Sequence, residues 1–301
     1  MADILITGGS GFLGKYICKS LSNEFNVSLL GRSSENDIIH DLSRSVKQYN
    51  KKFEHVIHVA GKAHVMPKDK FGAQEFFKIN LRGSINLIES LNRSGKMPQS
   101  FTFISSVSVY GKKIGEELDE SCLLLGDSPY AKSKIEAEKV ILDWSKRHGV
   151  PLLILRLPLI VGRNPPGNLG AMIKWMKMGL YFGIGKGEAQ KSMVLAQDVA
   201  QFIPTILGRE GIYNLSDGVH PTMIDFERTL AKTLGKPIPK RLPYSGVKLF
   251  ANLGDVLGEN FPINSSKLEK LTNTLTYCDS KARQNLGWKP RPVLSNLAEC
   301  I

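Results

Sequence analysis

Tyr130 and Lys134 lie four residues apart in the segment Ser128-Pro-Tyr-Ala-Lys-Ser-Lys134. The pattern predicts a helix from Tyr130 to about Lys146, and residues four apart share one face of a helix. A positive charge beside a phenol favours phenolate, so we expect Lys134 to lower the pKa of Tyr130. Such a tyrosine can act as a general acid or base near neutral pH. Because this spacing is common in helices, the pair alone does not establish an active site.

A strand that ends in hydroxyl groups lies upstream of this pair. The segment Phe103-Ile-Ser-Ser-Val-Ser-Val-Tyr-Gly111 begins as a buried apolar strand and carries Ser105, Ser106 and Ser108. One of these hydroxyls can donate a hydrogen bond to the same reacting centre as Tyr130. The chemistry that these residues suggest is proton exchange with an oxygen atom that a serine holds.

The N-terminus has the order strand, glycine-rich loop and helix. Residues 3–7 form a short apolar strand, Gly8-Gly-Ser-Gly-Phe-Leu-Gly14 follows, and an amphipathic stretch runs over residues 12–23. In this context the glycines indicate dinucleotide binding, because they permit a tight turn, close approach of a pyrophosphate and close helix packing. The free N–H groups of the helix N-terminus can then bind phosphate. The expected cofactor contacts in the loop are Gly8, Ser10, Gly11, Phe12, Leu13 and Gly14.

Strands and helices alternate through the first half of the chain. Further strands are expected at residues 26–30, 38–39, 54–59, 100–105 and 151–156, with a long helix at about 71–94. This alternation predicts an α/β fold with a doubly wound parallel (Rossmann) sheet over residues 1–161. A smaller C-terminal α/β lobe that binds substrate is expected over residues 162–301, with segments near 192–215 returning to the sheet domain.

Ligands of such sheets bind beyond the carboxyl ends of the strands. The residues that follow the predicted strand ends are Arg32, Asp41, Ala60, Gly61, Ser105, Ser106 and Pro158, together with the glycine loop. One parallel sheet would gather all of them at a single edge, which favours a cofactor site there.

The chain of 301 residues has a formal net charge of +12. This charge suits an anionic ligand, a nucleic acid or an anionic membrane surface. The basic residues are scattered and no nucleic-acid motif is present, so we expect a basic enzyme that binds no nucleic acid. No apolar stretch is long enough for a membrane span, no signal peptide is evident, and four widely spaced cysteines form no metal-ligand pattern. A cytoplasmic protein with free thiols and no metal is expected.

Several motifs taken together resemble a known family. They are Thr7-Gly-Gly-Ser-Gly-Phe-Leu-Gly14, His58-Val-Ala-Gly61, Asn80-Leu-Arg-Gly-Ser84, Ser105-Ser-Val-Ser-Val-Tyr-Gly111, Tyr130-Ala-Lys-Ser-Lys134 and Leu155-Arg-Leu-Pro158. In this order they are similar to the extended short-chain dehydrogenase/reductases, in the nucleotide-sugar epimerase/dehydratase group. Residues 192–198, 213–218 and 279–288 match later landmarks of that group. The chain looks most like a bacterial branch that contains UDP-glucose 4-epimerase-like proteins and 4-keto-sugar reductases.

The resemblance implies roles for the matched residues. Tyr130 would exchange a proton with the sugar oxygen, Lys134 would bind the nicotinamide ribose, and Ser106 matches the catalytic hydroxyl. The implied cofactor site also includes Asp41 and Leu42 beside the adenine, Pro158 at the nicotinamide, Asn80 in support, and Ala60, Gly61 and Ser105. The implied substrate contacts are Ser106, Ser108, Asn168 and Lys191. Read from the residues alone, Asp41 suits a turn equally well.

Arg32 bears on the choice of cofactor. An acidic residue after the second strand would bond the ribose 2′-hydroxyl of NAD, whereas an arginine accommodates a 2′-phosphate. The turn here is Gly31-Arg-Ser33, with no acidic residue. We therefore expect NADP(H) to be favoured, with NAD(H) possible.

The sequence leaves three functions open. The preferred hypothesis is reduction of the C4 ketone of a UDP- or dTDP-activated 4-keto-6-deoxy sugar, for surface polysaccharide precursors. The alternatives are a nucleotide-sugar 4-epimerase with tightly bound NAD, and a non-catalytic dinucleotide-binding module. By resemblance, the partner is a nucleotide sugar, and the helices at residues 71–94 and 130–147 could pair in a homodimer.

Overall fold

A seven-stranded sheet forms the centre of the fold. The computed structural model describes residues 1–63, 69–257 and 264–301. The strand order is β3-β2-β1-β4-β5-β7-β11, and neighbouring strands are parallel. The bounds are β1 Asp3–Thr7, β2 Asn26–Gly31, β3 Ile38–Ile39, β4 His55–His58, β5 Ser100–Ser106, β7 Leu152–Leu157 and β11 Gly211–Asn214. The order reverses between β1 and β4, which confirms the predicted Rossmann fold.

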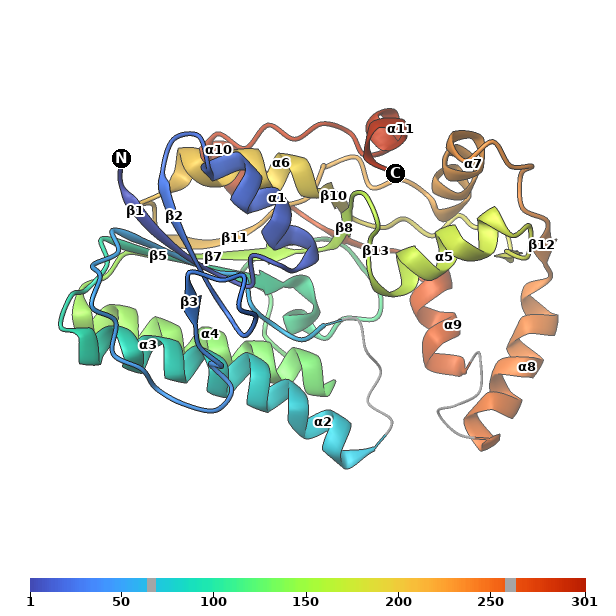
Figure 1. The fold of residues 1–301 in the computed structure, drawn as a ribbon. Helices are drawn as coiled ribbons and strands as arrows, with labels where there is room; N and C mark the ends of the chain where they lie inside the picture. The colour runs from blue at the N-terminus through green and yellow to red at the C-terminus, as the bar shows by residue number, and fades with distance from the viewer. Residues whose placement is uncertain (64–68, 258–263) are drawn as a thin grey trace.

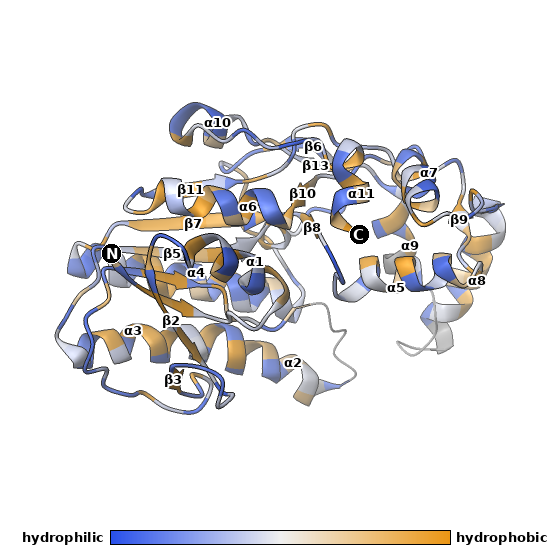
Figure 2. Cartoon of the chain, turned by 45° about the horizontal axis from the view of Figure 1, so that its top comes forward, coloured by the Kyte–Doolittle hydropathy of each residue, from blue (hydrophilic) through white to orange (hydrophobic). Residues whose placement is uncertain are grey.

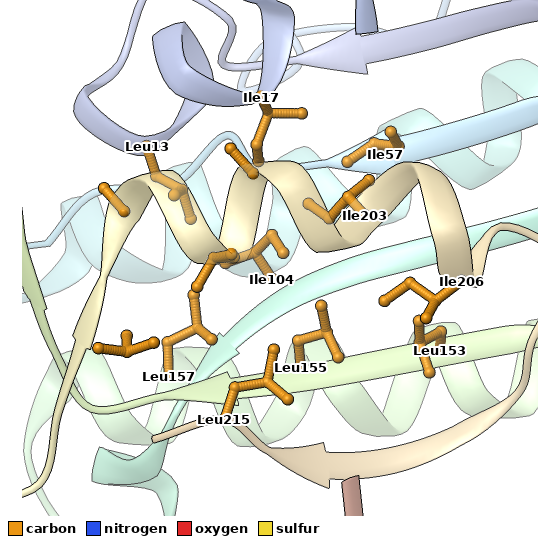
Figure 3. Packing of buried hydrophobic residues seen from close by; sticks show 14 of the residues in the cluster. Leu13, Ile17, Ile57, Ile104, Leu153, Leu155, Leu157, Ile203, Ile206 and Leu215 are labelled. Carbon is orange, nitrogen blue, oxygen red and sulfur yellow. The ribbon is translucent and has the colours of Figure 1, made fainter. Parts of the chain in front are cut away.

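Helices cover both faces of this sheet (Figure 1). On one face α1, Phe12–Leu21, packs against α6, Ala196–Phe202, and the short 3-10 turn Ile203–Ile206 follows α6. Leu13 and Ile17 of α1 belong to one buried cluster with Ile203 and with strand residues such as Ile57 and Leu155 (Figure 3). Because these side chains are buried, the apolar face of α1 fixes the start of the helix over the ends of β1 and β4.

The opposite face carries α2, Lys70–Phe76, α3, Gly83–Ser94, and α4, Pro129–His148. Their apolar side chains form a second cluster with the strands, for example Leu91 and Trp144 against Phe101. The single helix predicted for residues 71–94 is wrong in one respect, since η1, Phe77–Arg82, is π-helical and separates α2 from α3. Short π segments inside helices are common at functional sites, and this one contains Asn80.

The other elements lie outside the seven-stranded sheet, and Figure 2 shows most of them at the end of the molecule away from it. Three two-stranded sheets pair β10 with β8, β12 with β9 and β13 with β6. The strands are β6 Gly115–Leu118, β8 Leu159–Val161, β9 Gly183–Ile184, β10 Met193–Leu195, β12 Arg241–Leu242 and β13 Leu275–Tyr277. The helices are α5 Gly167–Lys177, α7 Met223–Thr233, α8 Tyr244–Leu257, α9 Ser265–Thr272, α10 Ser280–Leu286 and α11 Leu297–Cys300, with 3-10 turns at Val107–Tyr110 and Leu294–Asn296. Of the segments near 192–215 that were predicted to return to the sheet domain, β11 joins the large sheet and α6 packs against α1 on one of its faces, whereas β10 pairs with β8.

The helices α5, α7 and α11 share an apolar cluster of their own. Ile173, Phe226, Leu230 and Leu297 are buried together in it. No helix in the described ranges has both the length and the apolar character that crossing a membrane requires.

A buried ion pair joins α4 to the sheet. Arg156 of β7 donates to Glu138 of α4 from Nη2 at 2.6 Å and from Nε at 3.2 Å. The two side chains are only 3% and 5% exposed. Ser105 of β5 donates a further hydrogen bond to Glu138. Because Glu138 lies four residues beyond Lys134 in the same helix, this contact fixes the depth and rotation of the helix that bears the predicted catalytic pair.

The same arginine extends the contact to a third strand. Arg156 Nη1 donates to the Tyr110 hydroxyl at 3.1 Å, and that hydroxyl donates to Asn214 Oδ1 of β11 at 2.7 Å. The network therefore ties α4 to β5, β7 and β11, whose carboxyl ends lie beside one another.

Glu138→Gln should destabilise the protein by about 3–5 kcal/mol, because it leaves the Arg156 guanidinium buried without its counter-charge. Urea unfolding followed by circular dichroism measures this change. The control is Glu136→Gln on the exposed side of the same helix, for which a change within about 0.5 kcal/mol is expected. Equal effects of the two variants would contradict the proposed contribution of the ion pair to the stability of the fold.

Candidate active site

The glycine loop packs directly on the turn that follows β4. Gly8 has φ +75°, and a Cβ there would lie 2.6 Å from the main-chain nitrogen of Ala60. A Cβ at Gly14 would lie 2.0 Å from the Gly8 carbonyl oxygen. The close packing predicted for Gly14 is therefore present. Gly11 is the N-cap residue of α1, and this helix has no side-chain cap and no acidic residue in its first turn. The free N–H groups of the first turn of α1 therefore suit a phosphate.

The other residues of this loop that were predicted to contact the cofactor differ in the exposure of their side chains. Ser10 is exposed and lines a cavity beyond β2. The Leu13 side chain is buried in the core, and Phe12 packs edge-to-face on Tyr16. A phosphate could therefore meet the main chain of Phe12 and Leu13 and the hydroxyl of Ser10.

The cavity beyond β2 has a volume of about 640 Å³ and two arginines in its wall. It is lined by Ser10, Arg32, Ser33, Asn36, Ile39, His40, Asp41 and Arg44. Burial alone would raise the pKa of Asp41, but hydrogen bonds from Ser43 and the charges of Arg32 and Arg44 lower it. The Asp41 carboxylate accepts from Ser43 N at 3.0 Å and from Arg44 Nε at 3.2 Å, so Asp41 has the turn role that the sequence also allowed.

Two observations at this cavity differ from the sequence analysis. Arg44 was missed, although it lies three residues after Asp41 and next to a predicted strand end. Leu42 does not line the cavity, because its side chain is buried in the core, and its carbonyl oxygen accepts from Asn86 Nδ2 at 2.6 Å.

Lys134 is buried beneath the end of β5. Its Nζ donates to the Ile104 carbonyl oxygen at 2.7 Å and lies 4.1 Å from the centroid of the Phe103 ring. Burial lowers the pKa of Lys134 to about 8, although the Glu138 carboxylate opposes this shift. The ammonium is thus held by the main chain and is easier to deprotonate than an ordinary lysine.

Tyr130 precedes this lysine by four residues, on the first turn of α4. Its ring packs edge-to-face on Phe76, with the centroids 6.1 Å apart. Burial raises the pKa of Tyr130, and a hydrogen bond with Ser106 opposes the rise. The expectation that Lys134 lowers this pKa is therefore wrong for this structure, because desolvation of the phenolate is the larger effect and the ammonium is bonded to Ile104.

The three serines at the end of β5 have separate environments. Ser106 Oγ accepts from Ser108 N at 3.2 Å and begins the 3-10 turn. The Ser108 hydroxyl oxygen is buried and has no hydrogen-bond partner among the described residues. Ser105 is bonded to Glu138. Ser106 and Ser108 can therefore serve a ligand, whereas the side chain of Ser105, a predicted cofactor contact, is engaged in the buried network.

Asn80 joins the turn after β4 to α4. Its Oδ1 accepts from Lys62 N at 2.6 Å, and its Nδ2 donates to Ser133 Oγ at 2.9 Å. A Cβ at Gly61 would lie 3.2 Å from Asn80 Oδ1 and 3.9 Å from Lys134 Nζ. The π-helical segment thus supplies an amide that holds residues 60–62 against the predicted catalytic lysine.

His58 is a structural residue in this network. It is 1% exposed and shares hydrogen bonds with Thr7 Oγ1 at 2.6 Å and Ser84 Oγ at 2.9 Å. Burial, with the charge of Lys134, lowers its pKa to about 3. It is therefore neutral at physiological pH, and nothing gives it a part in proton transfer. His64 lies outside the described residues.

The predicted substrate contacts outside the sheet are spread over several elements. Lys191 Nζ donates to the Asn273 carbonyl oxygen at 2.5 Å, and burial lowers the Lys191 pKa to about 8. Asn273 also lines a cavity of about 300 Å³ between β9, β12 and the start of α8. Asn168 is exposed at the start of α5, and Pro158 lies partly exposed between β7 and β8.

The chain is similar to known proteins over nearly its whole length. The chain is 27% identical to a UDP-glucose 4-epimerase of Vibrio cholerae, over 97% of this chain and 92% of the relative. RMD from Pseudomonas aeruginosa, complexed with NADPH, has a TM-score of 0.74 and 22% identity, over 99% of this chain and 97% of that one. A UDP-glucuronic acid 4-epimerase from Bacillus cereus in complex with NAD has a TM-score of 0.75 and 20% identity, over 99% and 94%.

The sequence model of the NAD-dependent epimerase/dehydratase family matches residues 4–216, which include the glycine loop, Ser106, Tyr130 and Lys134. The chain belongs to the NAD-dependent epimerase/dehydratase family.

Proposed function

We propose that this protein uses NADPH to reduce the C4 ketone of a UDP- or dTDP-activated 4-keto-6-deoxy sugar, as a cytoplasmic step in surface polysaccharide synthesis. The observation that carries the proposal is the pair Arg32 and Arg44 in the wall of the cavity beyond β2. NADPH differs from NADH by a 2′-phosphate, and reductive enzymes consume the hydride that the cofactor supplies when bound.

The two arginines suit that phosphate. No acidic residue follows β2 in the turn 31–33, so this turn lacks the carboxylate that bonds the ribose 2′-hydroxyl of NAD in many dinucleotide-binding folds. Both guanidinium groups are close enough to Asp41 to lower its pKa. Asp41 alone cannot neutralise two cations, and a guanidinium binds phosphate well. The Pseudomonas protein of similar fold was solved with NADPH, and the Bacillus epimerase with NAD.

Tyr130 is the proposed proton donor. A phenol whose pKa is raised by burial stays protonated at neutral pH, which suits donation to the oxygen of a ketone that is being reduced. Ser106 would hold the same oxygen while negative charge develops on it. Lys134 would turn its ammonium to the nicotinamide ribose hydroxyls and so orient the cofactor.

The sugar and its diphosphate are proposed to lie between the sheet edge and residues 162–301. The unpartnered hydroxyl of Ser108 offers a hydrogen bond beside Ser106. Lys191 and Asn168 are the proposed diphosphate contacts. The cavity of about 300 Å³, which Asn273 lines next to Lys191, is the proposed place of the nucleoside.

A second candidate is 4-epimerisation, which the name of the Vibrio relative favours. It would use Ser106, Tyr130 and Lys134 twice, with the keto sugar turning between two hydride transfers. Bound NAD would then be recycled rather than consumed. A homodimer through α3 and α4 remains part of either proposal.

Tyr130→Phe should lower NADPH oxidation by about 10²–10⁴-fold with a 4-keto-6-deoxy nucleotide sugar, because it removes the proton donor and leaves the ring in place. Loss of absorbance at the nicotinamide band measures the rate. Lys132→Ala, exposed on the same helix, should leave the rate unchanged. Interconversion of gluco and galacto nucleotide sugars with no net NADPH loss would replace the reductase with the epimerase. Activity with neither substrate class would favour the non-catalytic module.

Arg32→Ala and Arg44→Ala should each weaken NADPH binding by about tenfold or more and leave NADH binding nearly unchanged, because each removes a charged hydrogen-bond donor from the 2′-phosphate. Titration of nicotinamide fluorescence gives both dissociation constants. Arg93→Ala, exposed on α3, is the control. Equal binding of the two cofactors, with equal loss in Arg32→Ala, would contradict the cofactor assignment.

NADPH binding should weaken as the pH rises through about 8. The pKa of Lys134 is lowered to about 8 in the free protein, so its charge is present below that pH and is lost above it. Fluorescence titrations at about pH 7 and about pH 9 compare the chain with Lys134→Met and with the exposed control Lys132→Met. Lys134→Met should weaken binding at the lower pH and flatten the profile. A profile that survives in Lys134→Met would rule out this lysine as its source.

A further inference from the structure

Large apolar side chains are exposed mainly in two segments outside the seven-stranded sheet. Nineteen such side chains are exposed in the described part of the chain, and ten of them lie within residues 175–182 and 238–253. Trp175, Met178, Leu180 and Phe182 in the first segment are 46–55% exposed. Scattered single residues of this kind are ordinary on protein surfaces, but a cluster indicates a binding surface.

The second segment contains an amphipathic helix with an unpartnered apolar side. Val247 and Ala251 of α8 are buried against Leu268 of α9. Leu249, Phe250 and Leu253 are 50–65% exposed on another side of α8. Because residues i, i+1 and i+4 lie within one arc of a helix, these three make an apolar stripe that no described residue covers.

Strand pairing holds the two segments together. β9 follows Phe182 and pairs with β12, which directly precedes α8. Gly183 N donates to the Lys240 carbonyl oxygen at 2.9 Å. Figures 1 and 2 both place α5 and α8 at the end of the molecule remote from the large sheet. We call residues 174–182 and 236–253 the basic apolar face.

The charge of this face has one sign. Residues 164–187 and 228–254 contain nine lysines and arginines and no aspartate or glutamate. Arg241 is neutralised by the buried Glu227, whereas Lys174, Lys177 and Lys248 are exposed beside the apolar side chains. Glu227 directly precedes the second range, and Glu188 and Asp255 directly follow the first and second ranges. Residues 174–182 and 236–253 themselves thus contain six lysines and arginines and no carboxylate.

We propose that the basic apolar face docks on the surface of an anionic phospholipid bilayer. Tryptophan, phenylalanine and leucine enter the boundary between headgroups and acyl chains, while lysine stems lie along it with their ammonium groups at the phosphates. A second copy of this chain is a poorer occupant, because a two-fold contact would set like charges against each other. A nucleic acid would leave the apolar stripe exposed to water.

Docking has a consequence for substrate access. The cavity of about 300 Å³ includes Tyr181, Lys186 and Tyr244 in its wall, and Tyr244 also belongs to the basic apolar face. A docked molecule would therefore present this cavity near the headgroups. Docking would serve reduction and epimerisation alike.

The test uses the full chain and its own fluorescence. Trp175 is 47% exposed, whereas Trp144 and Trp288, the other two tryptophans, are buried. With vesicles of phosphatidylglycerol and phosphatidylcholine, we expect a blue shift of the Trp175 emission and quenching by brominated acyl chains. Vesicles of phosphatidylcholine alone should bind weakly, and added salt should weaken binding to the anionic ones.

Matched variants decide whether this face is responsible. The double variant Phe250→Ser with Leu253→Ser should lower vesicle partitioning about tenfold or more and leave NADPH binding unchanged. The control is Leu123→Ser with Leu125→Ser, an equally exposed apolar pair elsewhere, which should partition like the unmodified chain. Failure to bind anionic vesicles, or equal losses in the two double variants, would overturn the proposal. A self-association that only the Phe250 and Leu253 variant abolishes, without vesicle binding, would assign the face to a second copy instead.

Discussion

The position of the predicted catalytic helix depends on the buried ion pair between Glu138 and Arg156. Two charges with 5% or less exposure are stable together and costly apart. Their bidentate geometry permits one depth and one rotation of α4 against β7. Tyr130 and Lys134 lie on the same helix, so the pair sets where their side chains meet the sheet edge. Tyr110 and Asn214 extend the constraint to the last strand of the sheet.

The same burial sets the chemistry of the site. It raises the pKa of Tyr130 and lowers that of Lys134, because water that would stabilise either charged form is excluded. Glu138 limits the shift at Lys134, since a carboxylate one helical turn away favours the ammonium. The ion pair thus acts on protonation as well as on position. A protonated phenol is better suited to donate a proton than to accept one, which supports the proposed reduction.

The proposed chemistry and the proposed surface contact lie in different parts of the molecule. The proposed hydride and proton transfers belong to the edge of the parallel sheet, where Gly8, Ala60, Ser106 and α4 meet. The proposed nucleoside cavity and the basic apolar face lie beyond it, around β9, β12 and α8. These elements have little buried apolar area in common with the sheet core, because α8 packs through a small cluster of its own. Such an arrangement lets the surface of the second region vary without disturbing the first.

The sequence by itself determined the strand, glycine loop and helix at residues 3–21, the parallel sheet, and the strand ends at which the cofactor site is proposed. These follow from local requirements, such as the absence of a Cβ at Gly8 and Gly14 and the period of apolar residues. The helix predicted at Tyr130–Lys146 is α4, Pro129–His148, because its cap and apolar spacing are also local.

Tertiary structure alone decided the π-helical segment at Asn80, the contact of Arg44 with Asp41 at the cavity beyond β2, and the ion pair of Glu138 with Arg156. It also reversed the expected direction of the Tyr130 pKa. Each of these depends on burial or on the packing of separate elements, and several join residues far apart in the chain. A local pattern can state which side chains are available, but only packing determines which charges lose their water and which partners replace it.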